Sequence, residues 1–213
     1  MVDISRDPRW GRIAEGAGED HYLGKLVAKA RVNGFQSKEN NYPLTASCPK
    51  HFIGYGASIG GRDYNNCDIS ENYLRTYYLP PFAESYKSGA LTTMCSFNDI
   101  FSIPLSVNKR LLYDILRKEI GFEGIVVSDW ESIEETIVHR VSRDKKEAAY
   151  KALLASVDID MHSGVYRDHL LEVINENEEL LDNLNQAVKR ILSVKYDLGL
   201  FDNPYTDEEK GKH

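Results

Sequence analysis

An aspartate at the end of a short uncharged run is the residue best placed to do chemistry. Residues 124–128 are mostly β-branched and carry no charge, which is typical of a buried strand, and Asp129 and Trp130 follow directly. A carboxylate at the carboxyl end of a buried parallel strand is where α/β barrels place their chemistry. The indole of Trp130 offers an apolar face on which a sugar ring can pack. These residues indicate a glycoside-cleaving enzyme with Asp129 as its nucleophile.

Three further polar residues are predicted to belong to the same site. Lys50 and His51 are adjacent at the end of a predicted strand, where two such side chains can hydrogen-bond sugar hydroxyls from two directions. Arg12 follows a Trp-Gly turn, and its planar guanidinium can bind vicinal hydroxyls or hold a carboxylate.

Structural interpretations of these residues stay open. Asp129 can be the cap of the helix-type sequence that follows it, because Asp is a favoured residue at that position. Trp130 can belong to the core, His51 can be a structural histidine, and Arg12 can form a structural salt bridge. The glycine-containing loop at residues 60–65 either shapes the mouth of a pocket or is only a turn.

Two further aspartates raise the question of a metal site. Asp158 and Asp160 alternate with apolar residues and so face one side of a predicted strand. With His51 or His162 they could ligate a metal, as in metal-dependent barrel hydrolases, but the chain has neither His-x-His nor His-Glu-x-x-His. We therefore predict no metal. Both aspartates are expected to pair with Arg or Lys in the barrel, because unpaired buried carboxylates are costly.

The elements that must position these side chains alternate along the chain. Short segments with little charge predict five strands, over residues 1–5, 44–48, 91–97, 124–128 and 156–161. Helical patterns separate all five, which indicates a parallel sheet covered by helices. Polar residues recur just after the strands and no glycine-rich phosphate loop follows the first, which favours a barrel over a doubly wound sheet.

The length of the chain limits how much of a barrel it can form. A (β/α)8 barrel typically takes about 250 residues. We therefore predict an α/β fold, a partial (β/α)8 TIM-type barrel with about the last five strand–helix units, and expect about three units upstream. Residues 1–202 are assigned to the C-terminal part of the barrel domain. Residues 203–213 are assigned to a polar tail or linker.

Capping residues predict where two of the helices begin and end. Asp20 is expected to cap a helix that runs to about Val32. Asn108 is expected to cap a helix over residues 109–120, which Gly121 ends.

Two more helices are predicted, one from a capping box and one from its apolar face. Asp68 and Glu71 predict a capping box for a helix over residues 74–87, and the Pro80-Pro81 pair should interrupt or kink that helix. A long amphipathic helix ends at Gly199. Its apolar face is marked by Leu180, Leu184, Ala187, Val188, Ile191, Leu192 and Leu198.

Charge and hydropathy exclude several classes of partner. Acidic side chains outnumber basic ones by 33 to 26, and the net charge at pH 7 is −7. Nucleic acid and anionic membrane both attract basic patches, so neither is expected as a partner. No apolar run approaches the roughly 20 residues that span a bilayer. The first residues lack the pattern of a signal peptide.

The motifs together resemble those of glycoside hydrolase family 3, in particular its bacterial β-glucosidases. The likeness follows the order of that family's catalytic barrel domain over nearly the whole chain. The stretches that carry it are residues 7–12 (DPRWGR), 15–20 (EGAGED), 50–52 (KHF), 61–65 (GRDYN), 78–82 (YLPPF), 94–98 (MCSFN), 121–130 (GFEGIVVSDW) and 199–202 (GLFD).

The resemblance implies a role for each candidate residue. Asp129 falls on the catalytic nucleophile, Arg12, Lys50 and His51 on residues that hold the sugar in the −1 subsite, and Trp130 on an aromatic that flanks it. The family works with retention of configuration. Its nucleophile forms a covalent glycosyl-enzyme while a second carboxyl group protonates the leaving oxygen and then activates water.

The resemblance therefore implies a retaining, exo-acting, β-glucosidase-like glycosidase that needs no metal and no organic cofactor. Its expected reaction is hydrolysis of terminal β-linked glucose, or xylose, in a β-glucoside or oligosaccharide. The family's early strands and the domain that supplies the acid/base are not recognised along the chain, so it is expected to be an incomplete fragment with little turnover. The alternative is a non-catalytic remnant, or a subunit that needs the missing parts from another chain. Exposed barrel edges predict self-association, and the family likeness indicates a periplasmic or secreted protein.

Overall fold

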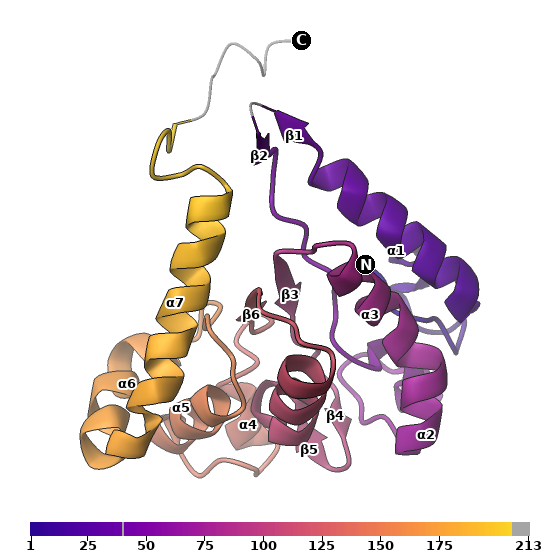
Figure 1. Ribbon diagram of the computed structural model, residues 1–213. Coiled ribbons are helices and arrows are strands. Elements are labelled where there is room, and N and C mark those ends of the chain that lie inside the picture. The colour runs from indigo at the N-terminus through magenta and orange to yellow at the C-terminus, as the bar shows by residue number, and fades with distance from the viewer. Residues whose placement is uncertain (40, 206–213) are drawn as a thin grey trace.

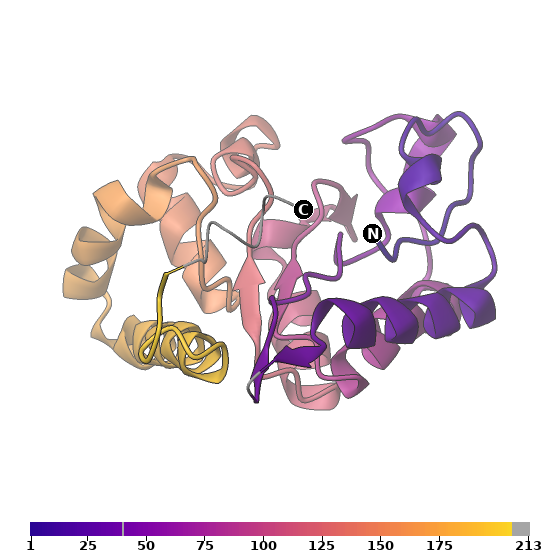
Figure 2. The ribbon, with the colours of Figure 1, turned by 90° about the horizontal axis from the view of Figure 1, so that it is seen from above.

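The computed structural model describes residues 1–39 and 41–205. At its centre two parallel strands pair, β3 (Thr92–Met94) and β6 (Ile125–Val127). Helices lie on both sides of this pair (Figures 1 and 2). On one side are α1 (His21–Phe35) and α3 (Leu79–Lys87), and on the other are α5 (Lys145–Leu154), α6 (Val165–Glu176) and α7 (Leu181–Asp197). The predicted α/β class is thereby confirmed.

Extended segments lie beside the two central strands in the order of the chain. The first predicted strand lies beside the second, the second beside β3, and the fifth beside β6. The backbone hydrogen bonds that link these neighbours include those from Val2 to Lys50 (2.9 Å), Thr92 to Ser47 (3.3 Å) and Ser128 to Ile159 (2.9 Å). All the carboxyl ends of these segments therefore meet at one edge.

The first, second and fifth predicted strands are wrong as regular strands, because side chains take backbone bonds that a ladder would use. The Asp3 carboxylate accepts the backbone N–H of His51 (2.7 Å), and Pro49 has no N–H to donate. In the same way the Asp158 carboxylate accepts the N–H of Val126 (2.7 Å). Only single bridges and isolated bonds remain on these sides.

Two short hairpins were not predicted. In one of them, residues Phe101 and Ser102 form the turn with positive φ angles of 58° and 63°. Such turns usually carry Gly or Asn, so the sequence held no signal for this one. The hairpins pair β1 (Lys38–Glu39) with β2 (Tyr42–Pro43), and β4 (Asp99–Ile100) with β5 (Ile103–Pro104).

Both helix starts predicted from Asp20 and Asn108 are confirmed. The Asp20 carboxylate accepts the N–H of Leu23 (2.6 Å), and α1 continues past Val32 to Phe35. The Asn108 side-chain oxygen accepts the N–H of Leu111 (3.1 Å). The helix that follows is the π-helical η6 (Arg110–Glu119), and Gly121 ends it with a φ of 75°.

The predicted capping box at Asp68 is wrong, because Ser70 caps the helix instead. Its hydroxyl accepts the N–H of Tyr73 (3.2 Å). The Pro80-Pro81 pair does not interrupt the helix and follows directly after a π-helical segment, where the register of the helical hydrogen bonds changes. Helical backbone runs on without a break through α2 (Glu71–Tyr73), the π-helical η4 (Leu74–Tyr78) and α3.

The last helix ends as predicted at Gly199, whose φ is 71°. Its apolar face is not buried as one surface, however: Ala187 is 3% exposed, whereas Val188 and Leu192 are 45% and 47% exposed. The remaining short helices are η1 (Ile13–Glu15), η2 (Tyr55–Ala57), η3 (Ile59–Gly61), η5 (Leu105–Val107), α4 (Glu135–Val138) and η7 (Glu178–Leu180).

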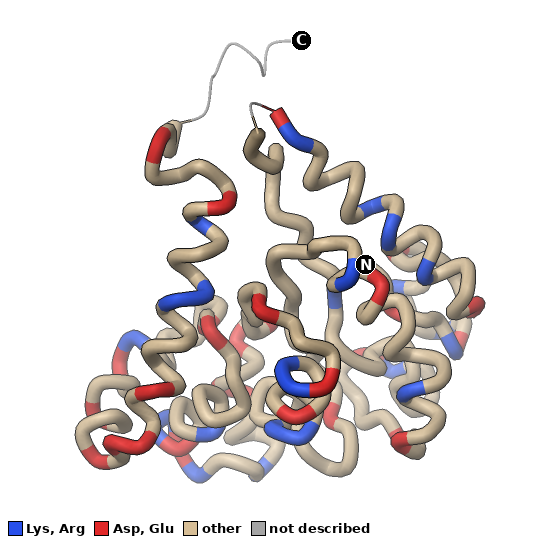
Figure 3. Tube along the Cα trace, in the orientation of Figure 1, with Lys and Arg blue, Asp and Glu red and all other residues tan. Residues whose placement is uncertain are grey.

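The surface and the tail complete the description. Lys and Arg are interspersed with Asp and Glu along the described chain (Figure 3). None of its helices combines the length and the apolar character needed to cross a membrane. Residues 203–205 are exposed, and the rest of the predicted tail, 206–213, lies outside the described residues.

Gly56 marks a close approach between the loop after His51 and the first segment. A Cβ atom there would lie 2.2 Å from the carbonyl oxygen of Ile4 and 3.0 Å from the Trp10 ring. We expect Gly56→Ala to lower the free energy of unfolding by about 1–3 kcal/mol through overpacking. Urea denaturation measures this, with Gly34→Ala in α1 as the control, because no atom lies within 4 Å of its new methyl group. Equal midpoints for the two variants would contradict the close approach.

Candidate active site

Asp129 follows β6 at its carboxyl end and is largely buried, at 8% exposed. Its Oδ1 atom accepts the backbone N–H of Trp130 (2.7 Å), while its buried Oδ2 atom has no hydrogen-bond partner among the described residues. Burial raises the pKa of Asp129 above its ordinary value, and the Trp130 hydrogen bond and the charges of His51, Lys50 and Arg12 oppose this rise. One oxygen of this carboxylate is therefore free for a reacting group.

The alternative that Asp129 caps a helix is wrong. The next helix, α4, begins only at Glu135, and Glu134 occupies its cap position. The side-chain bond of Asp129 is made to the adjacent Trp130 N–H, which lies in a turn. The carboxylate is consequently not committed to a helix terminus.

His51 lies between two carboxylates. Its ring is 1% exposed, with Nε2 3.5 Å from Asp129 Oδ2 and Nδ1 3.1 Å from Asp3 Oδ2. The backbone N–H of His51 donates to the same Asp3 oxygen (2.7 Å), and the Lys50–His51 peptide bond is cis. Sequence reasoning missed Asp3. The available signal was a lone charge in the otherwise apolar run 1–4.

Arg12 and Lys50 supply positive charge to the site. The Arg12 guanidinium donates to both carboxylate oxygens of Glu15 (2.7 and 2.9 Å) and lies over the Tyr55 ring at 5.6 Å. The salt-bridge interpretation of Arg12 is thus correct. The positive charge of Arg12 nevertheless also lowers the pKa of Asp129. Lys50 is half-buried, and its charge acts on both Asp129 and Glu15. The structure therefore brings Arg12, Lys50 and His51 within electrostatic reach of Asp129.

Trp130 is not a core residue, because 53% of it is exposed. Its ring stacks on that of His162 with centroids 3.8 Å apart. The His162 Nδ1 atom in turn lies 2.8 Å from Glu131 Oε1. The indole is therefore held as a flat, accessible surface beside Asp129.

The loop after η3 does more than turn the chain. Asp63 accepts the indole N–H of Trp10 (2.9 Å), and the Tyr64 ring packs on Phe97 at 4.1 Å. Trp10 in turn contacts the Tyr55 ring edge-on. This aromatic group joins three loops that follow extended segments, and so forms one wall of the edge that carries Asp129.

Buried polar atoms without partners gather in these same segments. Such atoms are costly in a protein interior and are normally satisfied. A ligand with several hydroxyl groups, placed at this edge, has the donors and acceptors to satisfy them. The unpaired atoms among the described residues are Asp3 Oδ1, Ser5 Oγ, Tyr55 OH, Asn98 Oδ1 and Asp129 Oδ2.

Only one of the two aspartates of the fifth segment pairs as predicted. Asp158 binds the guanidinium groups of Arg117 (2.6 Å) and Arg190 (2.7 Å). Asp160 instead accepts the Ser163 hydroxyl and a backbone N–H at the start of α6, because it lies one turn before that helix. No group of three His, Cys, Asp or Glu side chains in the described residues could hold a metal ion.

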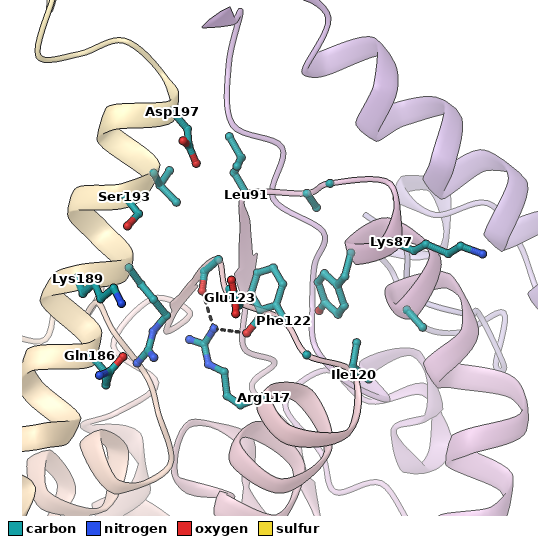
Figure 4. A pocket seen from close by; sticks show the side chains of 18 residues that line it. Lys87, Leu91, Arg117, Ile120, Phe122, Glu123, Gln186, Lys189, Ser193 and Asp197 are labelled. Atoms are coloured by element: carbon teal, nitrogen blue, oxygen red, sulfur yellow. Dashed lines mark hydrogen bonds between the residues drawn. The ribbon is translucent and has the colours of Figure 1, made fainter.

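A cavity of about 870 Å³ lies at the other end of the strands (Figure 4). It is lined by Leu91 and Gly124, which precede β3 and β6, and by α7. The Arg117 side chain at its wall already donates to the carbonyl oxygens of Phe122 (2.9 Å) and Gly124 (2.6 Å). The Arg117 guanidinium is thus used for structure, and Asp129, at the opposite end, does not line the cavity.

Comparison with known proteins decides the family. The protein-family model described as the glycosyl hydrolase family 3 N terminal domain matches residues 1–194 of the sequence. The chain belongs to glycosyl hydrolase family 3. The family resemblance of its motifs is confirmed.

Named relatives of this family 3 chain include glucosidases and xylosidases. It is 40% identical to a periplasmic beta-glucosidase of Salmonella typhimurium, over 97% of this chain and 27% of that protein. A putative beta-xylosidase of Formosa agariphila is 36% identical over 99% of this chain and 29% of its own length. The structure also matches the crystal structure of a beta-glucosidase from Listeria innocua in complex with glucose. That match has a TM-score of 0.92 and 39% identity, over 100% of this chain and 31% of the other. The family 3 chain thus spans less than a third of these relatives.

Proposed function

We propose that this chain carries the nucleophile half of a retaining, exo-acting β-glycosidase that cleaves terminal β-linked glucose. The observation that carries the proposal is the free Oδ2 atom of Asp129, buried at the edge of the sheet beside His51. Glucosidase and xylosidase names among its relatives support the substrate class.

In this proposal each residue has a separate task. Asp129 Oδ2 attacks the anomeric carbon as the bond to the leaving oxygen breaks, forming a covalent glycosyl ester. Lys50, His51 and Arg12 hold sugar hydroxyls and keep charge near the carboxylate, and the Trp130 ring packs against the substrate. A second carboxyl group protonates the leaving oxygen and then activates water.

The proposal extends to the architecture and the setting of the chain. The five neighbouring segments act as about the last five strand–helix units of a (β/α)8 barrel, with residues 1–202 as part of its domain and 203–213 as a tail. The natural setting is the periplasm or the exterior of the cell, as the name of the Salmonella relative suggests. Self-association stays a prediction, for which exposed side chains on α7, such as Leu192 and Tyr196, offer a surface.

The isolated chain is expected to turn over natural glucosides slowly, because general acid catalysis alone is typically worth about 10²–10⁴ in rate. A non-catalytic remnant, or a subunit completed by another chain, remains the second candidate.

Covalent trapping tests the proposal. The chain is incubated with a 2-deoxy-2-fluoro-β-glucoside that carries a dinitrophenolate leaving group, and its intact mass is measured. This leaving group departs without protonation, so a missing acid/base does not matter, and the fluorine slows loss of the adduct. We expect one glycosyl group per chain, on Asp129. A folded, soluble sample that gains no mass would refute the nucleophile half-site and favour the remnant.

The trapping rate should depend on pH through Asp129. Only the ionised carboxylate attacks, and burial raises its pKa above the ordinary Asp value. The rate is therefore expected to fall as the pH drops through that raised pKa and to level off above it. The second-order rate constant, measured from about pH 4 to about pH 8, checks this against the ordinary Asp pKa of about 3.9. A midpoint at or below that ordinary value would show that burial does not govern the carboxylate.

A further inference from the structure

We propose that Asp3 is a positioning residue that acts on the nucleophile site through His51. The inference rests on the proposed function of Asp129 and adds to it a residue of the first segment. Asp3 reaches neither Asp129 nor the edge where a sugar would bind by any hydrogen bond that the structure describes. It contacts the ring that does face Asp129.

The contacts between Asp3 and His51 define the state of the imidazole. Asp3 Oδ2 accepts the backbone N–H of His51 (2.7 Å) and lies 3.1 Å from its Nδ1 atom. An ionised carboxylate only accepts hydrogen bonds, so the proton of this contact lies on Nδ1. The hydrogen bond that one ring nitrogen makes determines the role of the other. Asp3 therefore directs the Nε2 edge of the ring toward Asp129.

The Nε2 atom of His51 faces Asp129 but makes no strong hydrogen bond to it. Its distance of 3.5 Å from Asp129 Oδ2 is long for a hydrogen bond. A sugar hydroxyl arriving at the carboxylate can therefore meet Nε2 without first breaking a strong contact. The Tyr55 ring lies edge-on to His51 at 5.0 Å and limits the ring from another side.

The burial of Asp3 is more than a structural contact requires. The residue is 2% exposed, and its Oδ1 atom has no partner in the described residues. An unsatisfied buried carboxylate oxygen is costly. Such local cost is characteristic of groups that hold a functional side chain in place.

The protonated nitrogen of His51 can be observed directly. Long-range ¹H–¹⁵N correlation spectra of the ¹⁵N-labelled chain distinguish Nδ1–H from Nε2–H rings among its six histidines. His51→Gln identifies the His51 signals. We expect a protonated Nδ1 in the wild-type chain and loss of that proton from Nδ1 in Asp3→Leu, whose side chain offers the ring no acceptor. A wild-type Nδ1 without a proton, or a proton that stays on Nδ1 in Asp3→Leu, would overturn the proposal.

The trapping reaction provides the functional arm. Asp3→Leu should form the glycosyl adduct at least about 10-fold more slowly, the scale seen when a hydrogen-bonding partner of a site residue is removed. Asp182→Leu, at an exposed position in α7, should react like the wild type. Equal rates for Asp3→Leu and the wild type would overturn the positioning role.

The two proposals fail in different ways. If the wild-type chain forms no adduct, the proposed glycosidase function fails, and the spectra still decide whether Asp3 sets the His51 tautomer. If Asp3→Leu does not fold, the wild-type spectrum alone decides, because a ring protonated only on Nε2 is incompatible with the Asp3 contact.

Discussion

Replacing Asp129 with alanine is expected to slow formation of the glycosyl adduct by a factor of at least about 10⁴, the scale seen when a catalytic nucleophile is removed. Charge from Lys50 and Arg12 remains in the variant, but no oxygen is left to attack the anomeric carbon. Intact-mass analysis after prolonged incubation should show the unmodified chain only.

The matched control is Asp182→Ala, which removes an exposed carboxylate from α7. It should gain one glycosyl group at the wild-type rate. Adduct formation by Asp129→Ala at that same rate would place the reactive carboxylate elsewhere and refute the assignment of the nucleophile.

Substitution of Asp129 should abolish adduct formation without unfolding the chain. Because burial raises the pKa of Asp129 in the folded chain, the folded state binds the proton more tightly than the unfolded state. The stability that comes from the protonated form is present at low pH and is lost as the pH rises through the raised pKa. At neutral pH the ionised carboxylate of Asp129 therefore lowers the stability of the folded state. Asp129→Asn should unfold at a temperature no lower than the wild type.

Replacing Asp158 with alanine should have the largest effect on stability, a loss of about 3–5 kcal/mol in the free energy of unfolding, as for other broken buried ion pairs. The Asp158 side chain is fully buried and binds Arg117, Arg190 and the backbone N–H of Val126. Burial lowers the pKa of Arg117 to about 10, although Asp158 opposes this. Without Asp158 that guanidinium would keep its burial and lose its countercharge.

Urea denaturation of the variant measures this loss. The control is Asp168→Ala, which removes an aspartate that also pairs with an arginine, Arg167, but at the surface. Exposed pairs of this kind contribute little, so its midpoint should match that of the wild type. Similar midpoints for Asp158→Ala and Asp168→Ala would mean that the buried cluster does not hold β6 to α7.

Local signals were enough to predict the elements that carry the site. The apolar run before Asp129 does contain a strand, β6, and Asp20 and Asn108 do cap helices. Each of these features depends on residues within about one turn or one strand of each other, so neighbouring side chains contain the information. The family motifs also placed Lys50 and His51 near Asp129, because these residues follow neighbouring parallel segments whose carboxyl ends meet at one edge.

Some predictions failed because neighbouring residues offer local options of similar energy, which a sequence pattern does not rank. Ser70 caps the helix in place of Asp68, and the turn at Phe101 and Ser102 forms without glycine. The exposure of Val188 and Leu192 on α7 depends instead on which segments pack against that helix, and sequence pattern could not show it.

The sequence alone determined the α/β class, the family and the placement of a carboxylate after a buried strand. Only the tertiary structure decided which charges meet that carboxylate. Asp3 and His51 are 48 positions apart, and the bonds between them replace backbone bonds that a regular ladder would make. A side chain can displace a ladder bond only when folding has already placed it beside a distant backbone N–H group. No periodicity or spacing along the chain records that contact.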